Sequence, residues 1–227
     1  MIELQGLSMS YPMGRDRVDV LKQVDLTIAN GERVAIFGPS GSGKTTLLLL
    51  LAGLEQPDRG VVRIDGVNLA DLDADARADL RRDQLGIIFQ SFHLVPSLVA
   101  LDNVALPLQI AGRTGARDRA REMLEAVGLA DRVRHYPSQL SGGEQQRVAI
   151  ARAMVHQPSL VLADEPTGNL DSDTGAKVGE LMFRMNAELG GTLVLVTHDP
   201  EVARQCDRRL ALRHGQLNET HGDAIPA

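Results

Sequence analysis

A glycine-rich octapeptide between an apolar run and a helix-forming stretch constrains this chain more than any other feature. Residues 38–45 read Gly-Pro-Ser-Gly-Ser-Gly-Lys-Thr and match the pattern G-x-x-x-x-G-K-[ST]. The apolar residues 34–37 predict a strand before it, and residues 45–52 predict a helix after it. Glycines let consecutive backbone N–H groups point inward, and the start of a helix adds partial positive charge. This order of strand, loop and helix predicts an α/β protein that holds polyphosphate in the loop.

The side chains of this loop have distinct expected contacts. We expect Lys44 to bridge the β- and γ-phosphates of a nucleotide, the Thr45 hydroxyl to ligate Mg²⁺, and Thr46 to donate to the α-phosphate. The remaining loop residues expected to surround the phosphates are Gly38, Ser40, Gly41, Ser42 and Gly43. The alternative is a glycine-rich turn that matches the pattern by accident, which is expected in roughly one chain of this length in a hundred.

Two carboxylates follow a predicted buried strand. Residues 160–163 are Leu-Val-Leu-Ala, and Asp164 and Glu165 come directly after them. Charged groups are costly at such a position unless a cation or a water requires them. We expect Asp164 to hold Mg²⁺ through water and Glu165 to accept a proton from an attacking water. The alternative is an ordinary ion pair at a strand terminus.

The composition is that of an ordinary folded protein. Of 227 residues, 43% are hydrophobic, 30 are acidic and 24 are basic, so the formal net charge is −6. Extended disorder is excluded, and a nucleic-acid partner is disfavoured because binding along a polynucleotide needs clustered Lys and Arg. The single Cys206 suits a reducing compartment. No apolar run approaches the ~20 residues of a membrane span, so we expect a cytoplasmic protein that meets a membrane only through a partner or a peripheral surface.

The rest of the chain divides into strand-rich and helix-rich parts. Polar and apolar residues alternate in 24–28, and the apolar run 61–64 leads into an Asp-Gly turn, which predicts antiparallel strands. Residues 160–163 and 192–197 lack polar alternation, which is typical of strands buried on both faces of an open α/β sheet. Residues 91–156 read as an inserted helical subdomain. One apolar helical stripe in it is formed by Ala120, Met123, Leu124 and Val127.

A third motif connects this chain with a known family. Residues 140–147 read Leu-Ser-Gly-Gly-Glu-Gln-Gln-Arg. Ser141 and Glu144 have the spacing of a capping box, so a well-capped helix start is one explanation. Two glycines in a first helical turn lower helix propensity but expose backbone N–H groups, which indicates a second anion-binding helix start. With the two motifs above, the segment resembles the signature of nucleotide-binding subunits of the ATP-binding cassette (ABC) family, from whose consensus Leu-Ser-Gly-Gly-Gln it departs at Glu144.

The resemblance covers nearly the whole chain and implies a fold. It implies a single ABC ATPase domain over residues 1–227, with a P-loop NTPase (RecA-like) core, an antiparallel β subdomain and an inserted α-helical subdomain. The core would comprise about residues 1–90 and 157–217, and the helical subdomain about residues 91–156. Residues 218–227 would form a frayed tail.

The resemblance also implies how ATP is bound. In the family, the second helix start contacts the γ-phosphate held by the phosphate loop of the other subunit, and this role falls here on Ser141, Gly142 and Gly143. ATP would then lie between two copies of the chain in a head-to-tail homodimer. The implied cofactors are ATP and Mg²⁺, and the implied activity is ATP hydrolysis coupled to transport.

Four single residues match smaller family elements. Gln90 resembles the glutamine that touches Mg²⁺ and senses the membrane partner, and His198 resembles the histidine that contacts the γ-phosphate and positions the water. Asp171, in the segment 168–171, resembles the main contact of the loop that crosses the dimer interface. Tyr11 matches the aromatic residue that stacks on adenine. Without the resemblance, these would be a surface glutamine, an ordinary histidine, a helix-entry residue and an ordinary tyrosine.

Four segments together resemble one bacterial branch, which contains the ATPases of lipoprotein-release and macrolide-efflux systems. They are residues 89–94, 103–108, 144–147 and 167–171. This branch implies a permease partner in the inner membrane that transmits mechanical motion, with the ATPase peripheral on the cytoplasmic face. We expect residues 92–108 to form the docking surface, unless helix packing within the subdomain accounts for their apolar character.

Two rival classes share the nucleotide site. A soluble ABC ATPase that acts on DNA or ribosomes usually carries two cassettes or a long coiled-coil insertion, and neither fits in 227 residues. A small P-loop kinase would transfer the γ-phosphate to an acceptor, and it has no use for residues 140–147 or for a base beside Asp164.

Overall fold

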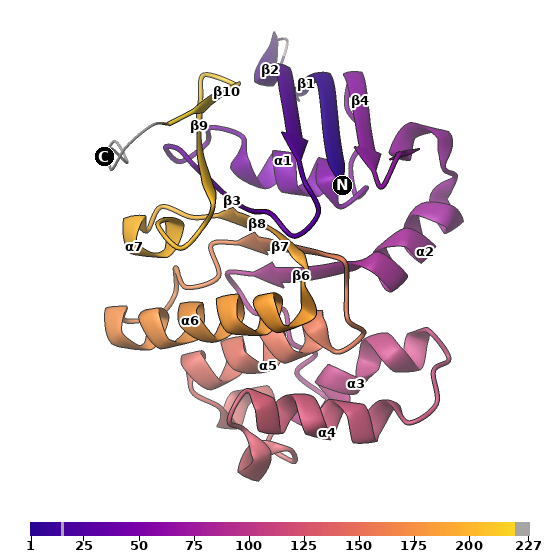
Figure 1. The fold of residues 1–227 in the computed structure, drawn as a ribbon, viewed down its shortest axis with the longest axis vertical. Coiled ribbons are helices and arrows are strands. Elements are labelled where there is room, and N and C mark those ends of the chain that lie inside the picture. The colour runs from indigo at the N-terminus through magenta and orange to yellow at the C-terminus, as the bar shows by residue number, and fades with distance from the viewer. Residues whose placement is uncertain (15, 221–227) are drawn as a thin grey trace. The chain divides into compact units, whose positions relative to one another are not determined.

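The computed structural model describes residues 1–14 and 16–220. It divides into two compact units, of which unit 1 comprises Met1–Arg81 and the chain from Thr192 onward, and unit 2 comprises Arg82–Gly191. The helices and strands of both are labelled in Figure 1. Each unit has its own strands and helices.

Unit 1 contains an antiparallel sheet of four strands in the order β2-β1-β4-β5. Its strands are β1 (Ile2–Met13), β2 (Asp16–Ile28), β4 (Arg59–Ile64) and β5 (Val67–Asn68). The predicted alternation is confirmed, because Val24, Leu26 and Ile28 are buried while the residues between them are exposed. The turn between β4 and β5 places Asp65 and Gly66 at positive φ, as the Asp-Gly pair predicted.

Unit 1 also contains a second, mixed group of strands. The group consists of β3 (Arg33–Phe37), β8 (Thr192–Val196), β9 (Arg208–Arg213) and β10 (Gln216–Glu219). Strand β3 runs parallel to both β8 and β9, whereas β10 is antiparallel to β9. Every residue of β8 is buried, as its uninterrupted apolar sequence predicted. The helices of this part are α1 (Lys44–Leu51), α7 (Pro200–Ala203), the short 3₁₀ helix η1 (Leu69–Asp71) and the first part of α2 (Ala74–Gln84).

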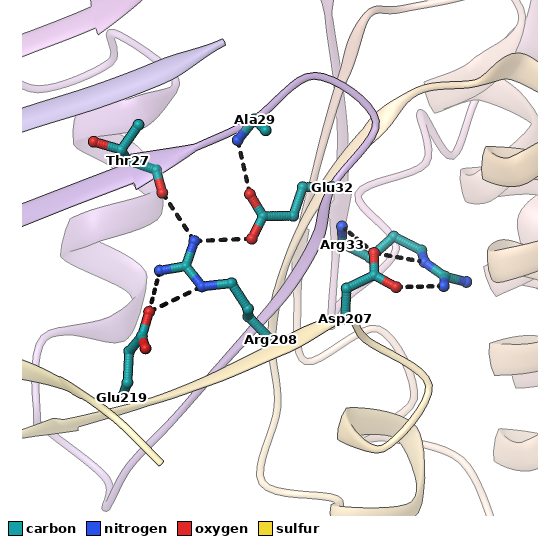
Figure 2. A network of polar contacts seen from close by, with 7 residues as sticks. All are labelled: Thr27, Ala29, Glu32, Arg33, Asp207, Arg208 and Glu219. Carbon is teal, nitrogen blue, oxygen red and sulfur yellow. Dashed lines mark hydrogen bonds and ion pairs between the residues drawn. The ribbon is translucent and has the colours of Figure 1, made fainter. Parts of the chain in front are cut away.

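A polar network links the two groups of strands in unit 1 (Figure 2). From β9, Arg208 donates to the carbonyl oxygen of Thr27 at 3.0 Å and to the carboxylate of Glu32 at 2.8 Å. It also donates through Nε to Glu219 of β10 at 3.0 Å. Glu32 in turn accepts from the backbone N–H of Ala29 at 2.7 Å. One guanidinium therefore fixes the end of β2, the turn before β3 and the last strand, using the several donors that only arginine offers.

Unit 2 has two parallel strands and four long helices. Its strands are β6 (Leu85–Phe89) and β7 (Leu160–Asp164), paired from Leu85 with Leu160 onward. Its helices are α3 (Ala100–Ile110), α4 (Ala116–Ala126), α5 (Gly142–Met154) and α6 (Ser172–Leu189), with 3₁₀ helices η2 (Ala130–Arg132) and η3 (Pro137–Gln139). Helices α4, α5 and α6 lie side by side in Figure 1, and α5 also packs on α3 and β6. The predicted stripe of α4 is buried.

The sequence predicted a frayed C-terminal tail and the boundaries of two subdomains. Asn218 and Glu219, the first residues of the expected frayed tail, pair with β9 as the end of β10, and residues 221–227 lie outside the described part. The boundaries expected for core and helical subdomain stay a prediction. In the part of the chain that the structure describes, no helix combines the length and apolar character of a membrane span.

Candidate functional site

The phosphate loop of unit 1 joins β3, which ends at Phe37, to α1, which begins at Lys44. Gly43 caps the helix with φ of 103°, and Gly41 has φ of 77°. Side chains other than glycine rarely adopt such left-handed conformations. The loop needs these two glycines for its backbone path, and it delivers Lys44, Thr45 and Thr46 to the first turn of α1, as the motif predicted.

Gly38, the first residue of the motif, is required for a different reason. A Cβ atom at this position would lie 2.3 Å from the carbonyl oxygen of Leu212 in β9 and 2.8 Å from Oγ of Ser42. Contacts this short require the backbone to move. The loop therefore lies directly against β9, and Gly38 allows this close approach.

Lys44 contacts its own loop in this structure. Its Nζ donates to the carbonyl oxygen of Gly38 at 2.8 Å and to that of Pro39 at 3.0 Å. These carbonyls hold the ammonium group over the curve of the loop, where phosphate oxygens would form stronger, charge-assisted bonds. The contact of Lys44 with phosphate stays a prediction.

Tyr11 lies beside the same helix start. From β1, its hydroxyl donates to the carboxylate of Glu55, and its oxygen lies 3.5 Å from Oγ1 of Thr46. Burial, followed by the bond to Glu55, raises the pKa of the Tyr11 phenol above its ordinary value. Unit 1 therefore brings Tyr11 next to the expected α-phosphate donor, and the stacking of its ring on adenine stays a prediction.

His198 lies two residues after Val196, the last residue of β8, and is exposed. It stands between the buried Thr197, whose Oγ1 accepts from the N–H of Asp199 at 3.0 Å, and the start of α7, which Asp199 caps. Two local hydrogen-bonded turns therefore fix the backbone on both sides of the histidine.

Asp164 and Glu165 lie at the end of β7 in unit 2, and both are half-buried. Glu165 has a φ of 47°, in the left-handed region that a residue with a side chain seldom occupies. The turn that follows is closed by a bond from the N–H of Gly168 to the Glu165 carbonyl oxygen at 3.0 Å. Strained backbone of this kind is concentrated at functional sites, which fits the role of base expected for Glu165.

The capping box that begins α5 is confirmed. Ser141 Oγ accepts from the N–H of Glu144 at 3.3 Å, and the Glu144 carboxylate accepts from the N–H of Ser141 at 2.8 Å. Arg132 adds an ion pair with Glu144 at 3.1 Å. The backbone N–H of Ser141, followed by Arg132, lowers the pKa of Glu144 to about 2.

The two glycines after Ser141 differ in their surroundings. Gly142 is half-buried, whereas Gly143 is buried, and a Cβ at Gly143 would lie 2.5 Å from Cγ2 of Thr174 in α6. The sequence argument explains both glycines by exposure of backbone N–H groups. At position 143 the close packing of α6 is a second physical reason for a glycine, and the anion-binding role expected for this helix start stays a prediction.

We predict that the charge of Glu144 stabilises the fold in a pH-dependent way. Because the folded pKa lies below the ordinary value of 4.5, its contribution is complete above about pH 4.5 and is lost as the pH falls through about 2. Glu144→Gln should lower the free energy of unfolding by about 1 kcal/mol at pH 7, since the amide keeps the cap but loses its charge. The deficit should shrink toward pH 3 in urea unfolding curves, with Glu125→Gln on the exposed face of α4 as control. An equal deficit at both pH values would contradict the prediction.

Within unit 2, Gln90 and the segment 168–171 are brought together. Gln90 follows β6, and its Nε2 donates to Oδ1 of Asn169 at 3.0 Å, while Asn169 Nδ2 donates to the Gln90 carbonyl oxygen at 3.0 Å. Asp171 caps α6 by accepting from the N–H of Thr174 at 3.0 Å, which lowers the pKa of its carboxyl group. In this structure Asp171 is therefore a helix-entry residue, which was the alternative explanation for it. Its contact across a dimer interface stays a prediction.

Sequence reasoning did not identify three residues that organise this part of unit 2. They are Asn169, Arg152 and Asn103. Asn103 is fully buried in α3 and bonds both the N–H and the carbonyl oxygen of Val95, at 2.7 and 3.1 Å, which fixes the segment after Gln90. A single asparagine inside an apolar helix is a signal that could have revealed it, because buried amides are retained where they are hydrogen-bonded. Asn169 and Arg152 carry no comparable local signal.

Comparisons with known proteins show the family of this chain. Residues 21–168 match the model of the ABC transporter family. The ATP-binding protein LolD of the lipoprotein-releasing system of Legionella pneumophila (strain Paris) is 52% identical over 94% of this chain and 95% of its own. LolD of Bordetella pertussis is 50% identical over 95% and 94%. The ABC transporter ATP-binding protein YbbA of Escherichia coli K12, itself uncharacterised, is 48% identical over 96% of both chains.

Solved structures show the same architecture. The ATP-binding cassette MJ0796, in a dimeric post-hydrolysis state bound to ADP and Pi, superposes with a TM-score of 0.89 at 44% identity. The match covers 98% of this chain and all of the other. The chain belongs to the ABC transporter family and has the ABC ATPase fold predicted from its motifs. Within the family it is an ATP-binding subunit of the LolD type, and its activity is ATP hydrolysis coupled to transport.

Proposed function

We propose that this chain drives a permease of the lipoprotein-release or macrolide-efflux type by closing as an ATP-dependent homodimer. The observation that carries the proposal is the pair of helix starts built to receive anions, one after Gly43 and one after Ser141. A nucleotide bound to one copy of the chain alone needs one such site, whereas a nucleotide held between two head-to-tail copies needs both. The dimeric state in which MJ0796 was solved with ADP and Pi supports this arrangement.

The roles in hydrolysis follow from the chemistry of each side chain. Lys44 holds the β- and γ-phosphates, Thr46 donates to the α-phosphate, and the Tyr11 ring provides a surface for adenine. Ser141, Gly142 and Gly143, from the second copy, contact the γ-phosphate through the start of α5.

Glu165 is the general base, and it takes a proton from the water that attacks the γ-phosphate. The positive φ of Glu165 and the closed turn that follows it fix the backbone that carries the carboxylate. Little reorganisation of this side chain is therefore needed in the reaction. His198, fixed by the turns on both sides, contacts the γ-phosphate and orients that water. Asp171 completes the interface between the copies.

The residues expected to hold Mg²⁺ suit that ion. Thr45 offers a hydroxyl, Asp164 a carboxylate and Gln90 an amide oxygen, and hard oxygen donors are the ligands that Mg²⁺ prefers. When bound, the ion neutralises charge that develops on the phosphate oxygens. The Gln90 amide meanwhile is held by Asn169, so Asn169 determines where that oxygen points.

The docking surface expected over residues 92–108 divides into two parts. In α3, the buried side chains of Leu101, Val104 and Leu108 pack within unit 2, so the packing alternative accounts for this part. In the preceding segment 92–99, the apolar side chains are only partly covered, and Asn103 holds their backbone in place. We assign permease docking to this segment, and thereby place the protein peripherally on the cytoplasmic face of the inner membrane.

Capture of the permease tests the proposal. A tagged chain purified from detergent extracts should retain a lipoprotein-release-type permease, identified by mass spectrometry. Leu98→Glu places a charge in the proposed surface and should lower capture at least about tenfold, as expected for one unpaired charge in an interface. Ile110→Glu, at the exposed end of α3, is the matched control and should capture normally. Ribosomes or DNA in place of a permease would overturn the proposal and favour the soluble ABC ATPase.

A further inference from the structure

The segment that follows Gln90 contains two adjacent residues in an unfavourable backbone conformation. Phe92 has a φ of 58° and His93 a φ of 47°, both in the left-handed region although neither is glycine. The turn is tight, because the N–H of His93 donates to the Ser91 carbonyl oxygen at 2.5 Å. Residues with bulky side chains persist in this region only where surrounding contacts hold them there. The segment therefore requires a specific external contact.

Arg152 provides that contact from the last turn of α5. Its Nη1 donates to the carbonyl oxygen of His93 at 2.6 Å, and its Nη2 donates to that of Phe92 at 2.8 Å. The planar guanidinium presents two parallel donors, which match two consecutive carbonyls. The ring of His93 packs edge-on against Phe89 with centroids 4.8 Å apart, which holds the other side of the turn.

Electrostatics make this contact stronger than a neutral hydrogen bond. Burial lowers the pKa of the Arg152 guanidinium, which nevertheless stays charged. In the described part of the chain, this cation donates to the two carbonyl oxygens, and these charge-assisted bonds compensate for its lost hydration. Releasing the turn would therefore leave a buried charge without its acceptors.

Helix α5 connects this contact to the nucleotide-facing end of unit 2. Arg152 lies ten residues after Gly142, a distance of about 15 Å along a rigid helix. Gly142 itself lies close to the same turn, since a Cβ there would be 3.9 Å from the Phe92 ring. The turn is thus hydrogen-bonded to the last turn of α5 through Arg152 and lies near the first residue of the helix through the Phe92 ring.

We infer that Arg152 is a positioning residue that fixes the turn 91–93 in its left-handed conformation and makes the turn move together with α5. The importance of Arg152 for transport rests on the proposed function, in which the turn transmits motion of the permease to α5, the helix that contacts ATP. The attachment itself can be tested without nucleotide or permease.

Hydrogen exchange of the nucleotide-free protein tests the attachment. Arg152→Met keeps the length of the side chain but removes both donors, so the amides of residues 91–95 should exchange about tenfold faster. Arg152→Lys keeps the positive charge but lacks the two parallel guanidinium donors, so it should give an intermediate exchange rate at residues 91–95. Arg121→Met, on the exposed face of α4, is the control and should leave these amides unchanged. Unchanged exchange at 91–95 in Arg152→Lys, or in a folded Arg152→Met, would overturn the inference.

A rescue experiment separates positioning from general packing. Glycine adopts positive φ without strain, so His93→Gly should remove much of the need for Arg152. In the His93→Gly background, Arg152→Met should therefore accelerate exchange less than about threefold. An undiminished effect would show that Arg152 contributes packing rather than holding the left-handed turn.

The coupling to α5 is measured with ATP. In a Glu165→Gln background, ATP should slow exchange both at 91–95 and at the start of α5, and adding Arg152→Met should abolish the slowing at 91–95 alone. Slowing that persists at 91–95 would overturn the coupling. If ATP slows exchange nowhere, the proposed function fails, whereas the nucleotide-free comparison still decides the role of Arg152.

Discussion

Glu165→Gln is expected to lower the rate of ATP hydrolysis by about two to three orders of magnitude, the usual contribution of a general base. The substitution preserves the size of the side chain, and both residues are equally unfavourable at the observed φ of 47°, so the backbone should not change. ATP binding should persist because the phosphate loop is intact. Dimers should then accumulate in size-exclusion chromatography with ATP but not with ADP, since the bound triphosphate is no longer removed.

The control for this prediction is Glu180→Gln, an exposed glutamate of α6. It should hydrolyse ATP at the parent rate and form no lasting dimer. Parent-rate hydrolysis by Glu165→Gln would show that another group takes the proton. The parent protein provides a second check, because its specific activity should fall on dilution below the concentration at which the ATP-bound dimer dissociates.

Lys44→Met is expected to weaken ATP binding itself. The ammonium group should form charge-assisted bonds to two phosphates, so its loss should raise the dissociation constant about tenfold to hundredfold. Methionine keeps the apolar length of the side chain, but it also removes the bonds to Gly38 and Pro39 that hold the loop in this structure. Thermal unfolding must therefore accompany titration with a fluorescent ATP analogue, to separate a loosened loop from a lost phosphate contact.

Lys22→Met, an exposed lysine of β2, is the matched control because it removes the same charge from unit 1. It should bind ATP as the parent does. If Lys44→Met were to keep the parent affinity with an intact fold, the assignment of the phosphate loop would be wrong. A loss of affinity in both variants would indicate a general electrostatic effect rather than a contact of Lys44.

Much of the fold was predictable because its signals are local. The strand, glycine loop and helix around Lys44 are encoded within some twenty consecutive residues, as are the antiparallel alternation of β2 and the stripe of α4. Local backbone preference and burial act over the same short range, so periodicity finds them. The capping box at Ser141 is predictable for the same reason.

The contacts that organise the site were not predictable, because they join residues far apart in the chain. Gln90 meets Asn169 across 79 positions, and Arg152 meets His93 across 59. The left-handed conformations of His93 and Glu165 carry no sequence signal either, since neither residue is a glycine. Tertiary contacts impose these conformations, and a single sequence does not record which partner imposes them.

The tight fit at Gly38 has a consequence for how glycine-rich motifs are interpreted. Since a methyl group there would collide with β9, an alanine variant would displace a strand of the sheet before any ligand arrived. Lost activity in such a variant would measure damage to the scaffold. Conversely, a protein in which the corresponding strand lay slightly further away could have alanine at this position and still bind its ligand. At this position, the neighbouring architecture rather than the binding chemistry sets the tolerance of the motif.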